Sequence, residues 1–163
     1  MPHPRPKLLF VCTGNICRSP MAEYLLRHHL GPESPWTVES AGLFTDDGAP
    51  PSEGAVEALR ARGLDLTPHR SRRLTRERID GADLIVVMTT VQAAEVKRRF
   101  PDLQQRVHLL KTFDTGCAPG DIPDPIGGSA AVYRAVCDEI EAALLDLIVR
   151  LKARSGAPNT DRG

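Results

Sequence analysis

The 163-residue sequence lacks the features of several common classes of protein. It has no net charge, with 21 basic and 21 acidic residues, and so carries no overall electrostatic signal for nucleic acid. Its longest aliphatic runs, 8–11 and 84–88, fall far short of the roughly 18 apolar residues that suggest a membrane span. Its first seven residues are polar and rich in proline, unlike a signal peptide. We therefore expect a cytoplasmic protein that binds neither nucleic acid nor membrane.

Metal-binding and nucleotide-binding motifs are also missing. The four cysteines include no Cys-x-x-Cys pair, and no histidine lies at the spacing of a zinc finger. The glycine-rich motifs that hold nucleotide phosphates are absent, and so is the His-Glu-x-x-His motif of metalloproteases. We expect no metal and no cofactor.

What the sequence does have is an alternation of short apolar runs and longer amphipathic segments. Continuous apolar runs predict buried strands, and apolar residues three and four apart predict helices. The order predicts one α/β domain over residues 7–152, built on a four-stranded parallel twisted sheet with helices on both faces. We expect a disordered arm at 1–6 and a flexible tail at 153–163. The predicted strands are 8–11, 36–40, 84–88 and 107–110, and the predicted helices are 20–30, 52–62, 90–100 and 129–152, with Ser19 and Ser52 as N-caps and Gly63 as a C-cap.

The loop that begins at Cys12, after the first predicted strand, has the composition of an anion-binding site. Ligands of parallel sheets bind beyond the carboxyl ends of the strands, where this loop lies. Gly14 and Asn15 tolerate a positive φ, so successive backbone N–H groups can turn inward around a phosphate. The start of the next helix adds its positive end, and Arg18 can pair with two phosphate oxygens at once. The same dipoles favour a nucleophilic thiolate at Cys12, to which Ser19 can donate a hydrogen bond.

The alternative for this loop is a buried structural cysteine beside a surface arginine. If Cys12 instead attacks phosphorus, the leaving group needs a proton. Asp114, Asp121 and Asp124 all fall between the fourth predicted strand and the last predicted helix, at the same edge of the sheet. Asp124 is the most constrained of them, because the proline that follows restricts its backbone. We expect Asp124 to be the general acid, with an ordinary turn residue as the alternative.

These residues together resemble a known family. Residues 12–23, 40–42, 83–89 and 124–125 resemble the motifs of the low-molecular-weight protein tyrosine phosphatases, and the resemblance covers nearly the whole chain. It implies a metal-free, two-step hydrolysis of phosphate monoesters through a phosphocysteine. The implied partner is a phosphorylated protein, and the implied product is inorganic phosphate.

The resemblance also implies the catalytic roles. Cys12 is the implied nucleophile and Arg18 the implied phosphate clamp. Asp124 is implied to protonate the leaving group and then to activate the water that frees phosphate. The implied phosphate-binding residues are those of the loop, Thr13, Gly14, Asn15, Ile16, Cys17 and Arg18.

Four further residues have implied supporting roles. Asn15, in a left-handed conformation, and Ser40 are implied to brace the loop, and Ser19 to stabilise the thiolate. Cys17 matches a second loop cysteine of the family, which can form a reversible disulfide with the nucleophile and protect it from over-oxidation.

The residues that would select the substrate give two signals. Many family members carry aromatic residues after the Asp-Pro pair as a wall against the phosphotyrosine ring, but Ile126 and two glycines follow here, and Phe44 is a candidate replacement. The string at 124–129 resembles the protein-arginine phosphatase branch of the family. That branch usually has threonine where this chain has Ile16, which suits the tyrosine-directed members. We expect phosphotyrosine as the substrate and phosphoarginine as the alternative, with specificity set by Ile16, Phe44 and Ile126.

Two other functions stay open. A thioredoxin-coupled arsenate reductase uses a similar loop and two further cysteines, for which Cys117 and Cys137 are the candidates, although they lie far apart in the sequence. A phosphate-binding module without turnover would use the same loop and would not need Asp124. The basic cluster at 69–78 is typical of a solvated surface, and a guide for acidic phosphoprotein substrates is the alternative.

Overall fold

The computed structural model describes residues 5–114, 116 and 120–156. The first four residues of the expected arm, Cys117 and the tail from 157 onward therefore lie outside the described residues. No helix in the described part of the chain combines the length and apolar composition that crossing a membrane requires.

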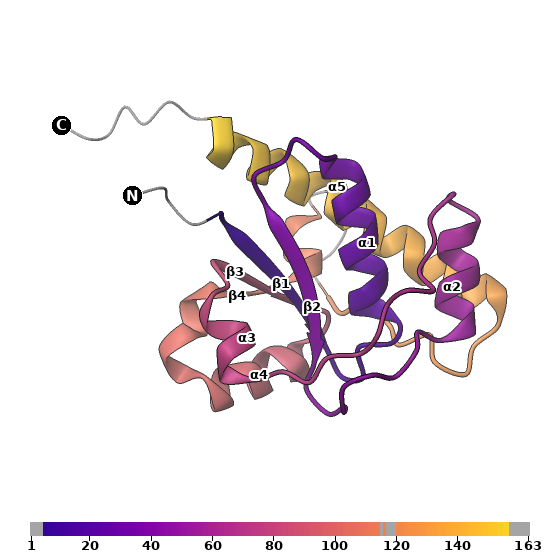
Figure 1. The fold of residues 1–163 in the computed structure, drawn as a ribbon, viewed down its shortest axis with the longest axis horizontal. Helices are drawn as coiled ribbons and strands as arrows, with labels where there is room; N and C mark the ends of the chain where they lie inside the picture. Colours follow the sequence, from indigo (N-terminus) through magenta and orange to yellow (C-terminus); the bar gives the residue numbers. More distant parts are fainter. Residues whose placement is uncertain (1–4, 115, 117–119, 157–163) are drawn as a thin grey trace.

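Four parallel strands form one sheet in the order β2-β1-β3-β4, which confirms the predicted architecture (Figure 1). The first strand in sequence lies inside the sheet, between β2 and β3, so the loop that follows it has a strand end on either side. β2 forms one edge of the sheet. The strands are β1 (Lys7–Cys12), β2 (Thr37–Gly42), β3 (Leu84–Val87) and β4 (Val107–Leu109).

Helices cover both faces of the sheet, and β1 shows why its run is apolar throughout. Leu8 and Phe10 belong to the core cluster beneath α1, α2 and α5, whereas Leu9 and Val11 belong to the cluster on the opposite face. Figure 1 shows the same division, with α3 and α4 on the other side of the sheet from α1 and α5. The helices are α1 (Arg18–Leu30), α2 (Glu53–Arg60), α3 (Arg76–Asp80), α4 (Thr90–Arg99) and α5 (Ala130–Gly156), with short 3-10 helices η1 (Pro101–Arg106) and η2 (Leu110–Phe113).

Of the three predicted helix caps, one agrees with the structure and two differ from it. Ser52 caps α2 as predicted, accepting a hydrogen bond from the Ala55 N–H. Ser19 is not a cap, because α1 already begins at Arg18 and no side chain caps it; the Ser19 hydroxyl is held among buried side chains instead. Gly63 is not the C-cap of α2, which ends at Arg60. It closes the turn just beyond with a φ of 76°.

One helix was not predicted, and another is longer than predicted. Sequence periodicity did not predict α3, because five residues are too few to show a helical repeat. Its start is marked by Thr75, whose side chain accepts a hydrogen bond from the Arg78 N–H. The last helix extends to Gly156, beyond the predicted end at 152.

Candidate active site

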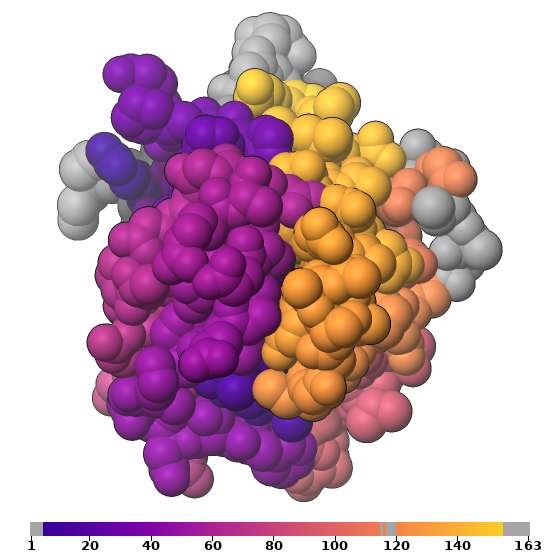
Figure 2. Space-filling model, turned by 90° about the vertical axis from the view of Figure 1, so that its right-hand side faces the viewer, coloured from indigo at the N-terminus to yellow at the C-terminus, as the bar shows by residue number. Residues whose placement is uncertain are grey.

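The loop after β1 lines a cavity of about 170 Å³ at the carboxyl edge of the sheet. Figure 2 shows indigo atoms of this early part of the chain low on one face, between the purple segment that follows β2 and the orange segment that precedes α5. The structure thus brings together the three residues with predicted catalytic roles, although more than a hundred positions separate Asp124 from Cys12. The lining residues are Cys12, Thr13, Gly14, Asn15, Ile16, Cys17, Arg18, Asp124 and Ile126.

Cys12 is the last residue of β1 and lies at the base of this cavity, with only 3% of its surface exposed. Its Sγ is 2.8 Å from the Ser19 Oγ. The Asn15 amide donates to that same Ser19 oxygen over 2.8 Å, which leaves the serine hydroxyl hydrogen for the sulfur. A hydroxyl that donates to sulfur stabilises a thiolate more than a thiol. Ser19 is therefore placed to support a nucleophilic Cys12.

Asn15 holds the loop in its unusual conformation. Its φ of 56° is the one positive value recorded for a non-glycine residue among those described. The side-chain amide donates to Ser19 and to the Ser40 Oγ, at 2.9 Å, while its oxygen accepts the Arg72 N–H over 2.9 Å. The Ser40 hydroxyl donates in turn to Glu23. The pairing of Asn15 with Ser40 is the one that the family resemblance implied.

His69 contacts the loop from a distant part of the sequence, and the sequence did not reveal this contact. Its Nε2 donates to the Asn15 backbone oxygen over 2.8 Å, which fixes the loop from outside the motif. Burial, together with the charges of Arg72, Arg27 and Arg70, lowers the pKa of His69 below its usual value despite the bond to Asn15. A neutral ring with its proton on Nε2 satisfies this geometry. No spacing in the sequence links residues 15 and 69.

Gln92 is a second residue that sequence reasoning missed. It is buried in the first turn of α4, where its side-chain oxygen accepts the N–H groups of Met88 and Thr89. Its side-chain nitrogen donates to the Thr13 hydroxyl over 3.2 Å. Thr89 and Gln92 form a capping box, a pattern visible in the sequence as Thr-x-x-Gln. That pattern could have located the helix start, although not the contact with Thr13.

Arg18 connects the loop to the segment that carries the predicted acid. Its Nη1 donates to the Ile122 carbonyl over 3.0 Å, and its Nη2 lies 3.7 Å from the Asp124 carboxylate. The segment is fixed to the sheet because the Ile122 N–H donates to the Met88 oxygen. Asp124 remains about half exposed and accepts the Ile126 N–H. Of the other two candidate acids, Asp121 accepts the N–H of Thr90 and neither it nor Asp114 lines the cavity.

Cys17 lines the cavity, and its thiol contacts two side chains that do not. Its Sγ lies 3.1 Å from the Ser52 Oγ and 3.6 Å from the Tyr133 hydroxyl, and burial raises the pKa of its thiol. Both Cys17 and Cys12 are free thiols. Cys137 is fully buried in α5, where burial raises its thiol pKa to about 11. Such a cysteine behaves as a small apolar side chain. This does not fit the disulfide exchange that a thioredoxin-coupled arsenate reductase would require of Cys137.

The predicted specificity residues divide between the cavity and its surroundings. Ile16 and Ile126 line the cavity, and Ile126 is 55% exposed. Phe44 does not line it: the ring is 66% exposed and lies 4.8 Å from the Arg99 guanidinium. Its backbone N–H donates to the Thr13 oxygen, so Phe44 lies beside the loop and is not part of the core.

Two further expectations concern charge and metal. In the basic cluster, Arg76 pairs with Asp80 and Asp102, and Arg78 pairs with Asp47, so these charges are balanced at the surface. Among the described residues no group of three or more histidine, cysteine or carboxylate side chains is arranged to hold a metal ion.

Comparisons with known proteins identify a family that covers most of the chain. The model of the family described as low molecular weight phosphotyrosine protein phosphatase matches residues 7–156. The chain is 40% identical over 146 residues to a protein-arginine-phosphatase of Geobacillus stearothermophilus, covering 90% of this chain and 96% of that one. It is 35% identical over 146 residues to a probable low molecular weight protein-tyrosine-phosphatase of Ralstonia nicotianae, again covering 90% and 96%.

Solved structures show the same two groups. The YwlE arginine phosphatase of Geobacillus stearothermophilus superposes with a TM-score of 0.85 at 39% identity, covering 92% of this chain and 95% of that chain. The tyrosine phosphatase Wzb of Escherichia coli K30, in complex with sulphate, superposes with a TM-score of 0.80 at 30% identity, covering 89% and 97%.

Proposed function

The chain belongs to the low molecular weight phosphotyrosine protein phosphatase family, and we propose that it hydrolyses phosphotyrosine in proteins through a phosphocysteine at Cys12. The observation that carries this proposal is that Cys12, Arg18 and Asp124 line one cavity. In this cavity the Cys12 sulfur is hydrogen-bonded to Ser19. The substrate is a phosphorylated protein, encountered in the cytoplasm, and the second product is inorganic phosphate.

In the first step the Cys12 thiolate attacks phosphorus, and the bond from phosphorus to the leaving oxygen breaks. Asp124 donates its proton to that oxygen, so the tyrosine leaves as a neutral phenol. Arg18 and the backbone N–H groups of the loop hold the three remaining phosphoryl oxygens, whose charge grows in the transition state. Ser19 stabilises the sulfur anion before attack and again when sulfur later leaves.

In the second step water attacks the phosphocysteine. Asp124, now a carboxylate, accepts a proton from the water, and the bond from sulfur to phosphorus breaks. Inorganic phosphate leaves and the Cys12 thiolate is restored. Asp124→Asn removes the proton donor and acceptor, while Cys12→Ser removes the nucleophile. Turnover by either variant at the wild-type rate contradicts the mechanism. A binding module without turnover is favoured instead if wild type shows no hydrolysis while both variants still bind phosphate esters.

The apolar side chains Ile16 and Ile126 at the cavity support an aromatic substrate, because both can pack against a phenyl ring. Phosphoarginine is the second candidate. It is favoured by the names of the two relatives from Geobacillus stearothermophilus and by the sequence at 124–129. The Ile16 side chain offers no hydroxyl to a guanidinium-linked phosphate, as a threonine would. For this reason we rank phosphoarginine second.

The test compares turnover of matched phosphotyrosine and phosphoarginine peptides by wild type and by Ile16→Thr. We expect wild type to prefer phosphotyrosine and Ile16→Thr to shift the ratio of kcat/KM towards phosphoarginine. Val149→Thr serves as the matched control, since it introduces the same side chain at an exposed position of α5 that does not line the cavity. Faster wild-type turnover of phosphoarginine would reverse the order of the two substrates.

We also propose that Cys17 protects Cys12 by forming a reversible disulfide. The Cys17 side chain must turn away from Ser52 and Tyr133 to do so. Activity lost to peroxide should return with a thiol reductant in wild type. A Cys17→Ser variant that recovers equally well contradicts this role.

A further inference from the structure

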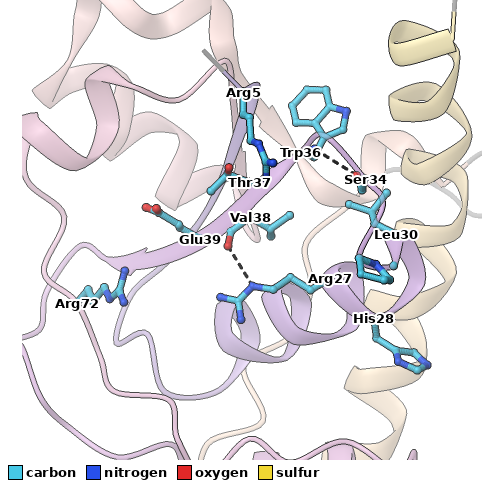
Figure 3. A pocket seen from close by; sticks show the side chains of 12 residues that line it. Arg5, Arg27, His28, Leu30, Ser34, Trp36, Thr37, Val38, Glu39 and Arg72 are labelled. Carbon is cyan, nitrogen blue, oxygen red and sulfur yellow. Dashed lines mark hydrogen bonds between the residues drawn. The ribbon is translucent and has the colours of Figure 1, made fainter. Parts of the chain in front are cut away.

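A second cavity, of about 660 Å³, lies along the outer edge of β2 (Figure 3). Its floor includes Thr37–Glu39 of β2, and its walls come from the last turns of α1 and from the turn that follows. Because β2 ends at Gly42, this floor lies about 10–16 Å before the strand end that faces the catalytic loop. The volume is in the range of sites for small molecules.

Three arginines from separate segments surround this cavity. Arg5 precedes β1, Arg27 lies on α1, and Arg72 lies on the segment that bridges to the end of β2, as Figure 3 shows. Arg27 pairs with Glu23, but neither Arg5 nor Arg72 forms an ion pair with any described residue. One carboxylate, that of Glu39, lines the same cavity, and it pairs with Lys7 over 3.0 Å.

The positive charge in this cavity is therefore not compensated by its own lining. Burial, followed by the nearby charge of Arg72, lowers the pKa of Arg27, and the charge of Glu39 offsets part of this effect. The guanidinium groups of Arg27 and Arg72 therefore repel one another. An anion placed between them would remove that repulsion. Guanidinium groups pair in a planar, two-pronged manner with carboxylate and phosphate oxygens, and a phosphoryl group offers more oxygens and more charge to several arginines than a carboxylate does.

Apolar side chains line the part of the cavity near Arg5. They are Trp36 and Leu30, and the half-buried ring of Trp36 also lies 5.7 Å from the Arg154 guanidinium (Figure 3). We propose that this cavity binds a small di- or triphosphate, with its phosphoryl groups among Arg5, Arg27 and Arg72. More than one phosphoryl group is needed to meet three arginines that come from separate segments. Any organic part of the molecule then lies toward Trp36.

Two short chains of contacts connect this cavity to the catalytic loop. The Arg72 backbone N–H donates to the Asn15 side chain. Arg27 pairs with Glu23, which accepts the Ser40 hydroxyl, and Ser40 accepts from Asn15. An anion that draws Arg27 away from Glu23 therefore alters the bracing of Asn15. Binding at this cavity is expected to change turnover at Cys12.

The binding test uses an internal probe, because Trp36 is the single tryptophan of the chain. Pyrophosphate, ADP and orthophosphate are titrated into the full chain at constant ionic strength while tryptophan fluorescence is followed. We expect a saturable change with pyrophosphate and ADP, and at least tenfold weaker binding by Arg72→Gln and by Arg5→Gln. Arg72→Gln keeps the backbone N–H that Asn15 accepts. Tighter binding of ADP indicates that a nucleoside occupies the apolar part, and equal binding indicates that the phosphate chain alone is recognised.

Arg73→Gln is the matched control, because it removes the same charge one position away and Arg73 does not line the cavity. It should bind pyrophosphate as wild type does. If pyrophosphate binds at the catalytic loop instead, its affinity should be the same for Arg5→Gln, Arg72→Gln and Arg73→Gln. A fluorescence change that is absent in wild type, or that Arg72→Gln and Arg73→Gln weaken equally, would overturn the site. This measurement requires no turnover, so it is independent of the proposed phosphatase activity.

The coupling to Cys12 is tested by kinetics. Pyrophosphate competes with substrate at the loop, which raises KM alone. Binding at the second cavity should in addition lower kcat in wild type and in Arg73→Gln, and this component should disappear in Arg72→Gln. Inhibition that is purely competitive in wild type would overturn the coupling.

Discussion

Replacing Asn15 tests whether the catalytic loop depends on one left-handed residue. Asn15→Gly keeps the positive φ accessible but deletes three hydrogen bonds, to Ser19, Ser40 and the Arg72 N–H. At about 1 kcal/mol net for each bond, the expected loss is about 2–3 kcal/mol in the free energy of unfolding. Asn15→Ala deletes the same bonds but keeps a Cβ in the left-handed region, which costs about 1–2 kcal/mol relative to glycine.

The comparison of the two variants isolates the backbone strain. Glycine loses about 0.5–1 kcal/mol more than alanine through the entropy of the unfolded chain, which offsets part of the strain. Asn15→Ala should therefore be less stable than Asn15→Gly by roughly 0.5–1 kcal/mol. Urea unfolding followed by circular dichroism measures both values, with the denaturant slope unchanged. If Asn15→Ala is as stable as Asn15→Gly, the loop does not need a left-handed residue at this position and the reasoning fails.

Three other changes give defined outcomes. Gly54→Ala should lower the free energy of unfolding by about 1–3 kcal/mol in urea titrations, because its Cβ would lie 2.3 Å from the Tyr133 ring, whereas Gly120→Ala, with open space around it, should not. The pKa of His69 is lowered in the folded state, so its contribution to stability is present above about pH 6.5 and is lost as the pH falls below that value. Thermal unfolding between pH 7 and 5 should therefore show a smaller loss in His69→Gln than in wild type. Asp124→Asn should lower kcat by about 10²–10⁴ for a phosphotyrosine peptide, and by much less for an aryl phosphate whose leaving group needs no proton; an equal loss for both would argue against a general acid.

The sequence revealed the parts of the site that are contiguous or that share a sheet edge. Cys12 and Arg18 lie in one loop, so their spacing and the preceding apolar run were enough to predict that they meet around an anion. Asp124 followed from topology, because a segment after the fourth parallel strand returns to the same edge. The four strands were predicted for a similar reason, since runs buried on both faces are apolar throughout.

The missed residues act over distances that no local pattern records. His69 contacts the backbone of Asn15, and Gln92 contacts Thr13, in both cases across loops whose paths depend on tertiary packing. For Ser19 the sequence predicted two roles, a helix cap and a hydrogen bond to Cys12, and the structure shows the second alone. A polar residue beside a site can thus form a hydrogen bond within the site and give up the helix cap that its local sequence favours.

The position of Arg18 has a consequence for the timing of catalysis. Its guanidinium faces Asp124 and also holds the Ile122 carbonyl. A phosphate dianion that enters the loop competes with Asp124 for the same nitrogen, while the Ile122 contact keeps the segment in place. A bound dianion would therefore separate the Asp124 carboxyl from Arg18 while the segment that carries it stays held at Ile122. The phosphate of a substrate would in this way release the proposed acid, and a molecule without a phosphate would leave it paired with Arg18.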